Sequence, residues 1–135
     1  AAAAALAEPR LLDEPRHRRA ALAILDRITR SVEKTPARHR DSSFRILRQG
    51  LAYAWSVLVA ADFDAGKPFM EKWMRSPDRD IRWIMQQNLK KARLARADRG
   101  WVTRWSRELA SRLGKGAKTR DKGQGDKRRE ARRKN

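Results

Sequence analysis

Two groups of basic side chains carry the clearest chemical signal in this sequence. The first group consists of Lys90, Lys91, Arg93, Arg96, Arg99 and Arg104, and the second of Lys127, Arg128, Arg129, Arg132 and Arg133. Ammonium and guanidinium groups bind phosphate oxygens without reading base sequence. We therefore expect these residues to bind nucleic acid non-specifically, with DNA as the first candidate.

Residue types suited to catalysis or metal binding are sparse. His17 and His39 lie among arginines, and neither has a carboxylate pair or a second histidine at a metal-ligand spacing. We recognise no nucleophile motif and no glycine loop that would cradle a phosphate. The absence of cysteine excludes disulfides and cysteine-based metal sites. These features predict a non-enzymatic protein without a cofactor or a metal.

The overall charge agrees with an anionic partner. The 135 residues contain 34 Lys and Arg against 16 Asp and Glu, which gives a net charge of +18. Such a balance favours DNA, RNA or an acidic protein as a partner, although the same charges could simply form a solvated surface. We expect no membrane binding, because every bulky apolar stripe is needed for the core. With no apolar run of about 20 residues and no secretion signal, the expected location is cytoplasmic.

The basic groups must be positioned by helices, because apolar residues recur at spacings of three and four along most of the chain. Five helices are predicted, at about 14–34, 42–61, 68–75, 78–97 and 101–113. The second is apolar nearly all round, which predicts packing on two sides. Residues 62–67 are predicted to form a turn. From residue 115 the chain has ten basic and three acidic residues and no large apolar residue, so we expect a disordered tail.

These elements divide the sequence into three parts. Residues 1–13 are an amino-terminal end of uncertain structure, residues 14–114 a helical domain, and residues 115–135 a disordered basic tail. The expected fold class is all-α. Most of the five tryptophans have the spacing of core residues, whereas Trp83 lies off the apolar stripe of its helix and is expected to be exposed or to contact a neighbouring helix.

Two predicted helix starts share a pattern. Asp41 is followed by Phe44-Arg45 and then Leu47, and 37 residues later Asp78 is followed by Ile81-Arg82 and then Ile84. A repeat of this length, with a helix before each copy, is typical of stacked helix pairs. The pattern Asp-x-x-apolar-Arg-x-apolar resembles the HEAT-repeat family over about residues 15–97.

The resemblance implies a short HEAT-like α-solenoid of antiparallel helix pairs. It also implies a ladder of bonds between neighbouring units, made by Asp41, Arg45, Asp78 and Arg82. The sequence departs from the family pattern at Met85 and Asn88, where small residues are usual, and at Arg48, where an apolar residue is expected. A non-repeating helical bundle is the alternative fold. Because about three repeats are usually needed for stability, either a dimer or further repeats before residue 1 would fit this array.

Two further functions follow from the same resemblance. One is a HEAT-type protein-interaction scaffold for an acidic partner. The other is a fragment of the HEAT-like glycosylases that repair alkylated DNA, which use Trp, Asp and Arg around the damaged nucleotide. This chain carries such residues at Trp73, Asp78, Arg82, Trp83, Trp101 and Trp105, but their spacing does not match that family's motif.

Overall fold

A computed structural model describes residues 13–112, and every regular element in that range is a helix. The predicted all-α class is therefore confirmed for this part of the chain. The elements are α2 (Pro15–Lys34), the short 3₁₀ turn η2 (Ala37–His39), α3 (Ser42–Ala61), α4 (Phe63–Met74), α5 (Arg79–Leu89), α6 (Ala92–Ala97) and a last helix at 99–112. The expected tail and the amino-terminal end lie outside the described residues.

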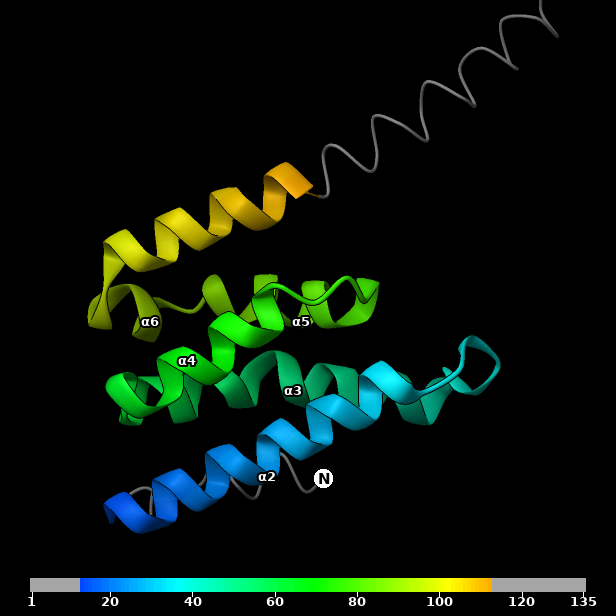
Figure 1. Ribbon diagram of the computed structural model, residues 1–135, viewed down its shortest axis with the longest axis horizontal. Helices are drawn as coiled ribbons and strands as arrows, with labels where there is room; N and C mark the ends of the chain where they lie inside the picture. Colours follow the sequence, from blue (N-terminus) through cyan, green and yellow to red (C-terminus); the bar gives the residue numbers. More distant parts are fainter. Residues whose placement is uncertain (1–12, 113–135) are drawn as a thin grey trace, which may run out of the picture.

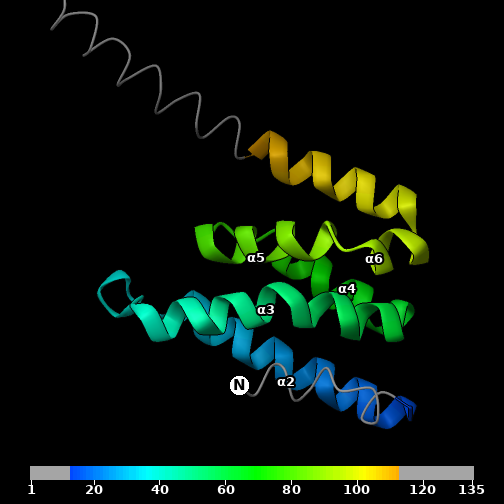
Figure 2. The same cartoon turned by 180° about the vertical axis from the view of Figure 1, so that it is seen from behind.

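The helices stack one above another, with α2 at one edge and the last helix at the other (Figure 1). Helices α2 and α4 lie on one side of the stack, and α3, α5 and α6 lie on the other, as the view from behind also shows (Figure 2). Helix α3 packs against α2, α4, α5 and α6. Helices α3 and α5 both begin at the same end of the stack and run side by side (Figures 1 and 2).

Helix α3 forms the centre of the core, as its apolar circumference predicts. Its side chains Leu51, Trp55 and Leu58 are completely buried. The buried indole Nε1 of Trp55 donates to the hydroxyl of Thr29 at 3.0 Å, and that hydroxyl donates to the carbonyl of Leu25 at 2.8 Å. The single polar atom of this large side chain is thus satisfied inside the core, where an unpaired N–H would cost about 1–3 kcal/mol.

Helix α4 begins earlier than predicted, at Phe63 instead of Pro68. The carboxylate of Asp62 caps it by accepting the backbone N–H of Ala65 at 3.2 Å. Gly66 then lets the first turn approach α3, since a Cβ at this position would lie 2.9 Å from Cα of Val59. The predicted turn at 62–67 is therefore wrong, because the cap and the close contact extend the helix ahead of the proline.

The helix predicted at 78–97 is interrupted. Helix α5 ends at Leu89, Lys91 is extended with ψ 128°, and α6 starts at Ala92. In one continuous helix the directions of Leu94 and Ile81 would differ by about 140° around the axis, which would place Leu94 on the outer face. The break changes the helical phase, so that both Leu94 and Ile81 are completely buried.

The buried amide of Asn88 joins α5 to the backbone of α3. Its Oδ1 accepts the N–H of Ser56 at 2.8 Å, and its Nδ2 donates to the carbonyls of Leu51 at 3.0 Å and Ile84 at 2.7 Å. A small apolar residue could make none of these bonds. At a position where the resemblance implies a small residue, the amide of Asn88 therefore links α5 to α3.

Four of the five tryptophans are buried core residues, as their spacing predicts: Trp55, Trp73, Trp101 and Trp105. Trp83 is only partly buried and packs against the edge of the core. Among residues 13–112, no helix combines the length and the apolar character that crossing a bilayer requires. The same residues contain no group of three His, Cys, Asp or Glu side chains arranged to hold a metal ion.

Candidate nucleic-acid interface

In both copies of the repeated sequence pattern, the aspartate caps the start of a helix. Asp41 caps α3 by accepting the N–H of Phe44 at 3.2 Å, and Asp78 caps α5 by accepting the N–H of Ile81 at 3.1 Å. Phe44 and Ile81 are both buried. The equivalent positions, 37 residues apart, are therefore a capping carboxylate and the first core residue of a helix.

The carboxylates have partners other than those implied by the ladder. Asp78 binds Arg40, with 2.7 Å between Arg40 Nη2 and Asp78 Oδ2. Arg45 is exposed, and the described part of the chain offers it no carboxylate within 4.0 Å. Arg82 is half-buried, and its Nε has no hydrogen-bond partner among residues 13–112. The ion pairs to the start of α5 therefore come from Arg40, in the loop before α3, and not from the two motif arginines.

Asp80 holds a second arginine from α3. Its Oδ1 accepts from Arg48 Nη1 at 2.8 Å, while its Oδ2 accepts from Arg40 Nη1. The Arg48 guanidinium also lies over the ring of Trp83, 4.1 Å from the ring centre. Arg48 corresponds to Met85 in the second copy of the sequence pattern, and its charged side chain links α3 to α5.

Arg40 uses all five of its N–H donors. They bind the carbonyls of Thr35 at 3.0 Å and Val32 at 3.1 Å, both oxygens of Asp78, and Asp80. The hydrogen bond to Asp78 is the main reason that the pKa of Arg40 is raised above its ordinary value. Burial alone would raise the pKa of Asp78, but the hydrogen bonds from Arg40 and from the N–H of Ile81 outweigh it and keep that pKa low.

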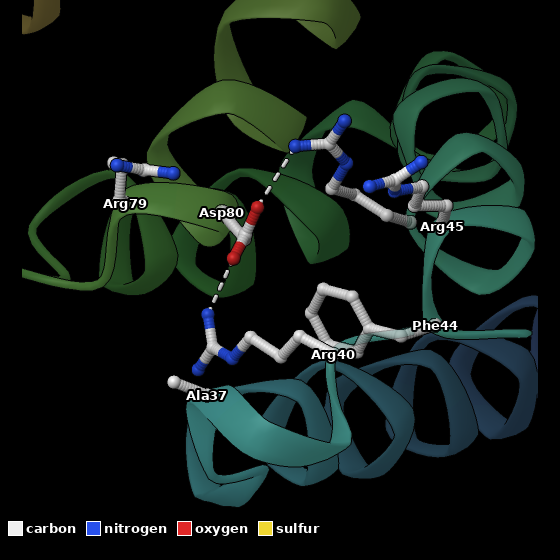
Figure 3. Close-up of a pocket in the computed structure, with 7 residues that line it drawn as sticks. Ala37, Arg40, Phe44, Arg45, Arg79 and Asp80 are labelled. Carbon is white, nitrogen blue, oxygen red and sulfur yellow. Dashed lines mark hydrogen bonds and ion pairs between the residues drawn. The ribbon is translucent and has the colours of Figure 1, made fainter. Parts of the chain in front are cut away.

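These contacts form the wall of an open cavity of about 460 Å³, which we call the arginine pocket (Figure 3). It is lined by Ala37, Arg40, Phe44, Arg45, Arg48, Arg79 and Asp80. The pocket lies where α3 and α5 begin, and a helix N-terminus carries a partial positive charge. Four guanidinium groups and two helix starts around one carboxylate make this cavity a suitable place for an anion.

The predicted basic residues near α6 lie around the opposite end of α5. Lys90 follows the end of α5, and Lys91 precedes the start of α6. Lys90, Arg96 and Arg99 are exposed and Lys91 is half-exposed. We call these four residues the α6 surface.

Arg93 and Arg104 differ from the α6 surface because each contacts an aromatic ring. Arg93 is half-buried, donates to Ser56 Oγ at 3.1 Å and lies 4.9 Å from the ring centre of Tyr53. Arg104 is exposed and lies 5.7 Å from the ring centre of Trp105. The second predicted group lies outside the described residues: Lys127, Arg128, Arg129, Arg132 and Arg133.

Ion pairing divides the described chain into two parts. Before residue 90, seven Lys or Arg side chains lie within 4.0 Å of a carboxylate. Residues 90–112 contain eight Lys and Arg against two acidic residues, and within the described range none of the eight has such a carboxylate. The positive charge of this part is therefore left for the solvent or a partner.

Sequence reasoning did not identify Arg40, Arg48, Arg79 and Asp80 as a cluster. The sequence feature that could have indicated this cluster was Arg48, a charged residue within the apolar stripe of its helix. The glycosylase alternative would need tryptophan rings that are accessible to a damaged nucleotide. Trp73, Trp101 and Trp105 are instead buried in the core. Comparison of the sequence with protein-family models and curated proteins, and a search of the solved structures, gave no match.

Proposed function

We propose that this chain is a non-enzymatic module that binds nucleic acid through its phosphates. The α6 surface and Arg104 supply the contacts on the folded part, and the basic residues at 127–133 add further charges. One observation carries the proposal: the eight basic side chains of residues 90–112 have no carboxylate partner in the described part of the chain. Unpaired cations are free to displace the counterions of a phosphate backbone.

We further propose that the helices form a short HEAT-like array, with α2–α3 and α4–α5 as successive pairs. Support comes from the matching roles of Asp41 with Asp78 and of Phe44 with Ile81. The shared side of α3, α5 and α6 then forms a continuous surface that carries the arginine pocket at one end and the α6 surface at the other. An experimental structure in which these helices cross as a non-repeating bundle would refute this part of the proposal.

The test is the salt dependence of binding to a labelled DNA duplex, followed by fluorescence anisotropy. The variant Lys90→Gln/Arg96→Gln/Arg99→Gln removes three exposed charges of the α6 surface. Each lost phosphate contact should reduce the slope of log K against log salt by about 0.9, so three should reduce it by roughly 2–3. The matched control Arg19→Gln/Arg27→Gln/Lys34→Gln removes three exposed charges from α2 and should leave the slope nearly unchanged.

Two results would contradict the proposal. Equal losses in both triple variants would mean that only net charge matters, and not the α6 surface. No binding by the whole chain near physiological salt would exclude nucleic acid as the ligand. In the full-length chain, neutralising Lys127, Arg128, Arg129, Arg132 and Arg133 to Gln measures the share of the second group without shortening the protein.

An acidic protein partner is the second candidate, and the outer face of α3 supports it. Ile46 is 64% exposed and Tyr53 is 46% exposed, one on each side of Gln49 on the same helix face. Arg93 lies beside Tyr53. This combination suits an amphipathic helix with acidic flanks, and Ile46→Glu should abolish such binding while leaving the salt slope for DNA unchanged.

A further inference from the structure

The arginine pocket differs from the α6 surface in having fixed and free donors side by side. Arg40 has no donor left for a ligand, because all five bind the protein. Arg48 donates one N–H to Asp80, and its guanidinium lies over the ring of Trp83. Its position is thus set before a ligand arrives.

Two other arginines of the pocket have guanidinium donors available for a ligand. The side chains of Arg45 and Arg79 form no ion pair among residues 13–112. Both are exposed, and Figure 3 shows them on different sides of Asp80, one from α3 and one from α5. Together with Arg48, they provide three guanidinium groups that can donate to one anion from several directions.

The charge of the pocket fits a doubly charged ligand. The pocket is lined by four guanidinium groups and by the carboxylate of Asp80, and Arg40 is also bound to Asp78, which leaves a net charge of about +2 on these six groups. A phosphomonoester carries a charge of about −1.5 to −2 and three strong acceptor oxygens. The phosphodiester inside a nucleic-acid strand has one charge and two free oxygens, so it would use fewer of the available donors.

We propose that the arginine pocket binds a phosphomonoester and that this group is the terminal phosphate of a nucleic-acid strand. The second half of the inference rests on the proposed function. Arg79 is the first residue of α5 and Lys90 follows its last, so the two are eleven residues apart, about 16 Å along the helix axis. At a rise of about 3.4 Å per base pair, this distance equals about five base-pair steps along the axis of a duplex, so a duplex whose terminal phosphate lies in the pocket can extend to the α6 surface.

The experiment compares three duplexes of one sequence that end in a 5′-phosphate, a 3′-phosphate or only hydroxyl groups. Anisotropy is measured with the full chain at near-physiological salt. Either the 5′-phosphate duplex or the 3′-phosphate duplex should bind about tenfold more tightly than the hydroxyl duplex. The reason is that charge-assisted bonds worth about 1.4 kcal/mol give a factor of ten. Arg45→Gln/Arg79→Gln should reduce that ratio to about one. Arg19→Gln/Arg27→Gln, with the same charge change on α2, should preserve it.

The outcomes separate the two proposals. Equal binding of all three duplexes by the unaltered chain overturns the assignment of the pocket to a strand terminus and leaves the proposed function standing. No binding of any duplex overturns the proposed function. In either case, the pocket alone is tested by titrating the protein with inorganic phosphate and recording the NMR signals of the arginine Nε–H groups. Saturating shifts at Arg45 and Arg79 would assign it to a small phosphorylated molecule, and the absence of shifts would refute a phosphate site.

Discussion

Arg40, in the loop before α3, forms ion pairs with both carboxylates at the start of α5, Asp78 and Asp80. Its side chain is 19% exposed, and those of Asp78 and Asp80 are 13% and 14% exposed, so water cannot easily replace it. Removing one partner of such a pair costs more than the pair contributes, because charges stay buried without compensation.

Arg40→Met should therefore lower the free energy of unfolding by about 2–4 kcal/mol. Urea unfolding followed by circular dichroism measures this. Arg45→Met is the matched control, since Arg45 lines the same pocket but has no ion pair in the described chain, and it should change stability by no more than about 0.5 kcal/mol. Similar losses in both variants would show that the Arg40 network is not the cause.

Asp78 makes stability depend on pH in a definite direction. Its pKa is lower in the folded state than in the unfolded chain, so its contribution is complete above the unfolded pKa of about 3.9. The contribution is lost as the pH falls through the folded pKa, because protonation breaks the pair with Arg40.

Asp78→Asn keeps a capping side chain but removes the charge. Between pH 5 and pH 2.5 the variant should lose less unfolding free energy than the unaltered protein, by about 1.4 kcal/mol for each unit by which the folded pKa is lowered. Urea unfolding at several pH values gives both curves. The exposed Asp64, changed to Asn, serves as the control, and an Asp78 variant with the same pH dependence as the unaltered protein would contradict the assignment.

At the scale of the helices, two glycines with opposite surroundings test the packing of α4 on α3. A Cβ on Gly66 would lie 2.9 Å from both Cα and Cγ2 of Val59. On Gly100, in the last helix, it would lie 3.5 Å from Asp98 Oδ1, an ordinary contact. A glycine inside a helix is otherwise about 1 kcal/mol less favourable than alanine.

Gly66→Ala should thus destabilise the protein by about 1–3 kcal/mol, despite the better helix propensity of alanine. Gly100→Ala should stabilise it by about 0.4–1 kcal/mol. Thermal unfolding of the two variants measures both changes in stability. If both were stabilising, α4 would not approach α3 as closely as Gly66 requires.

At the scale of the whole molecule, α3 connects the other elements into one core. It packs against α2, α4, α5 and α6, and buried tryptophans lie in α3, α4 and the last helix. Loss of any one of these neighbours would expose apolar residues of α3. The helices are therefore expected to unfold together.

Urea unfolding should give coincident transitions by tryptophan fluorescence and by circular dichroism at 222 nm. Fluorescence reports the packing of the tryptophan-bearing helices, whereas circular dichroism reports all of the helical backbone. A fluorescence midpoint well separated from the circular dichroism midpoint would mean that the stack opens in parts.

The sequence by itself determined that the described chain is helical and which side of α2 and of α3 is buried. The bounds of α3 and the apolar stripe Leu22, Leu25 and Val32 of α2 follow from local rules, because capping and a 3.6-residue period depend only on neighbouring residues. The same rules predicted buried tryptophans. They also found the repeat in which Asp41 and Asp78 both cap helices.

Only the tertiary structure decided where α5 ends and which arginine meets which carboxylate. The break before α6 depends on burying Leu94 against other helices, and the start of α4 depends on the contact between Gly66 and Val59. Arg40 reaches Asp78 across 38 positions of the chain, and long side chains have no sequence period that fixes such a partner. The arginine pocket exists because two helix starts distant in sequence lie side by side, and a one-dimensional pattern does not contain that proximity.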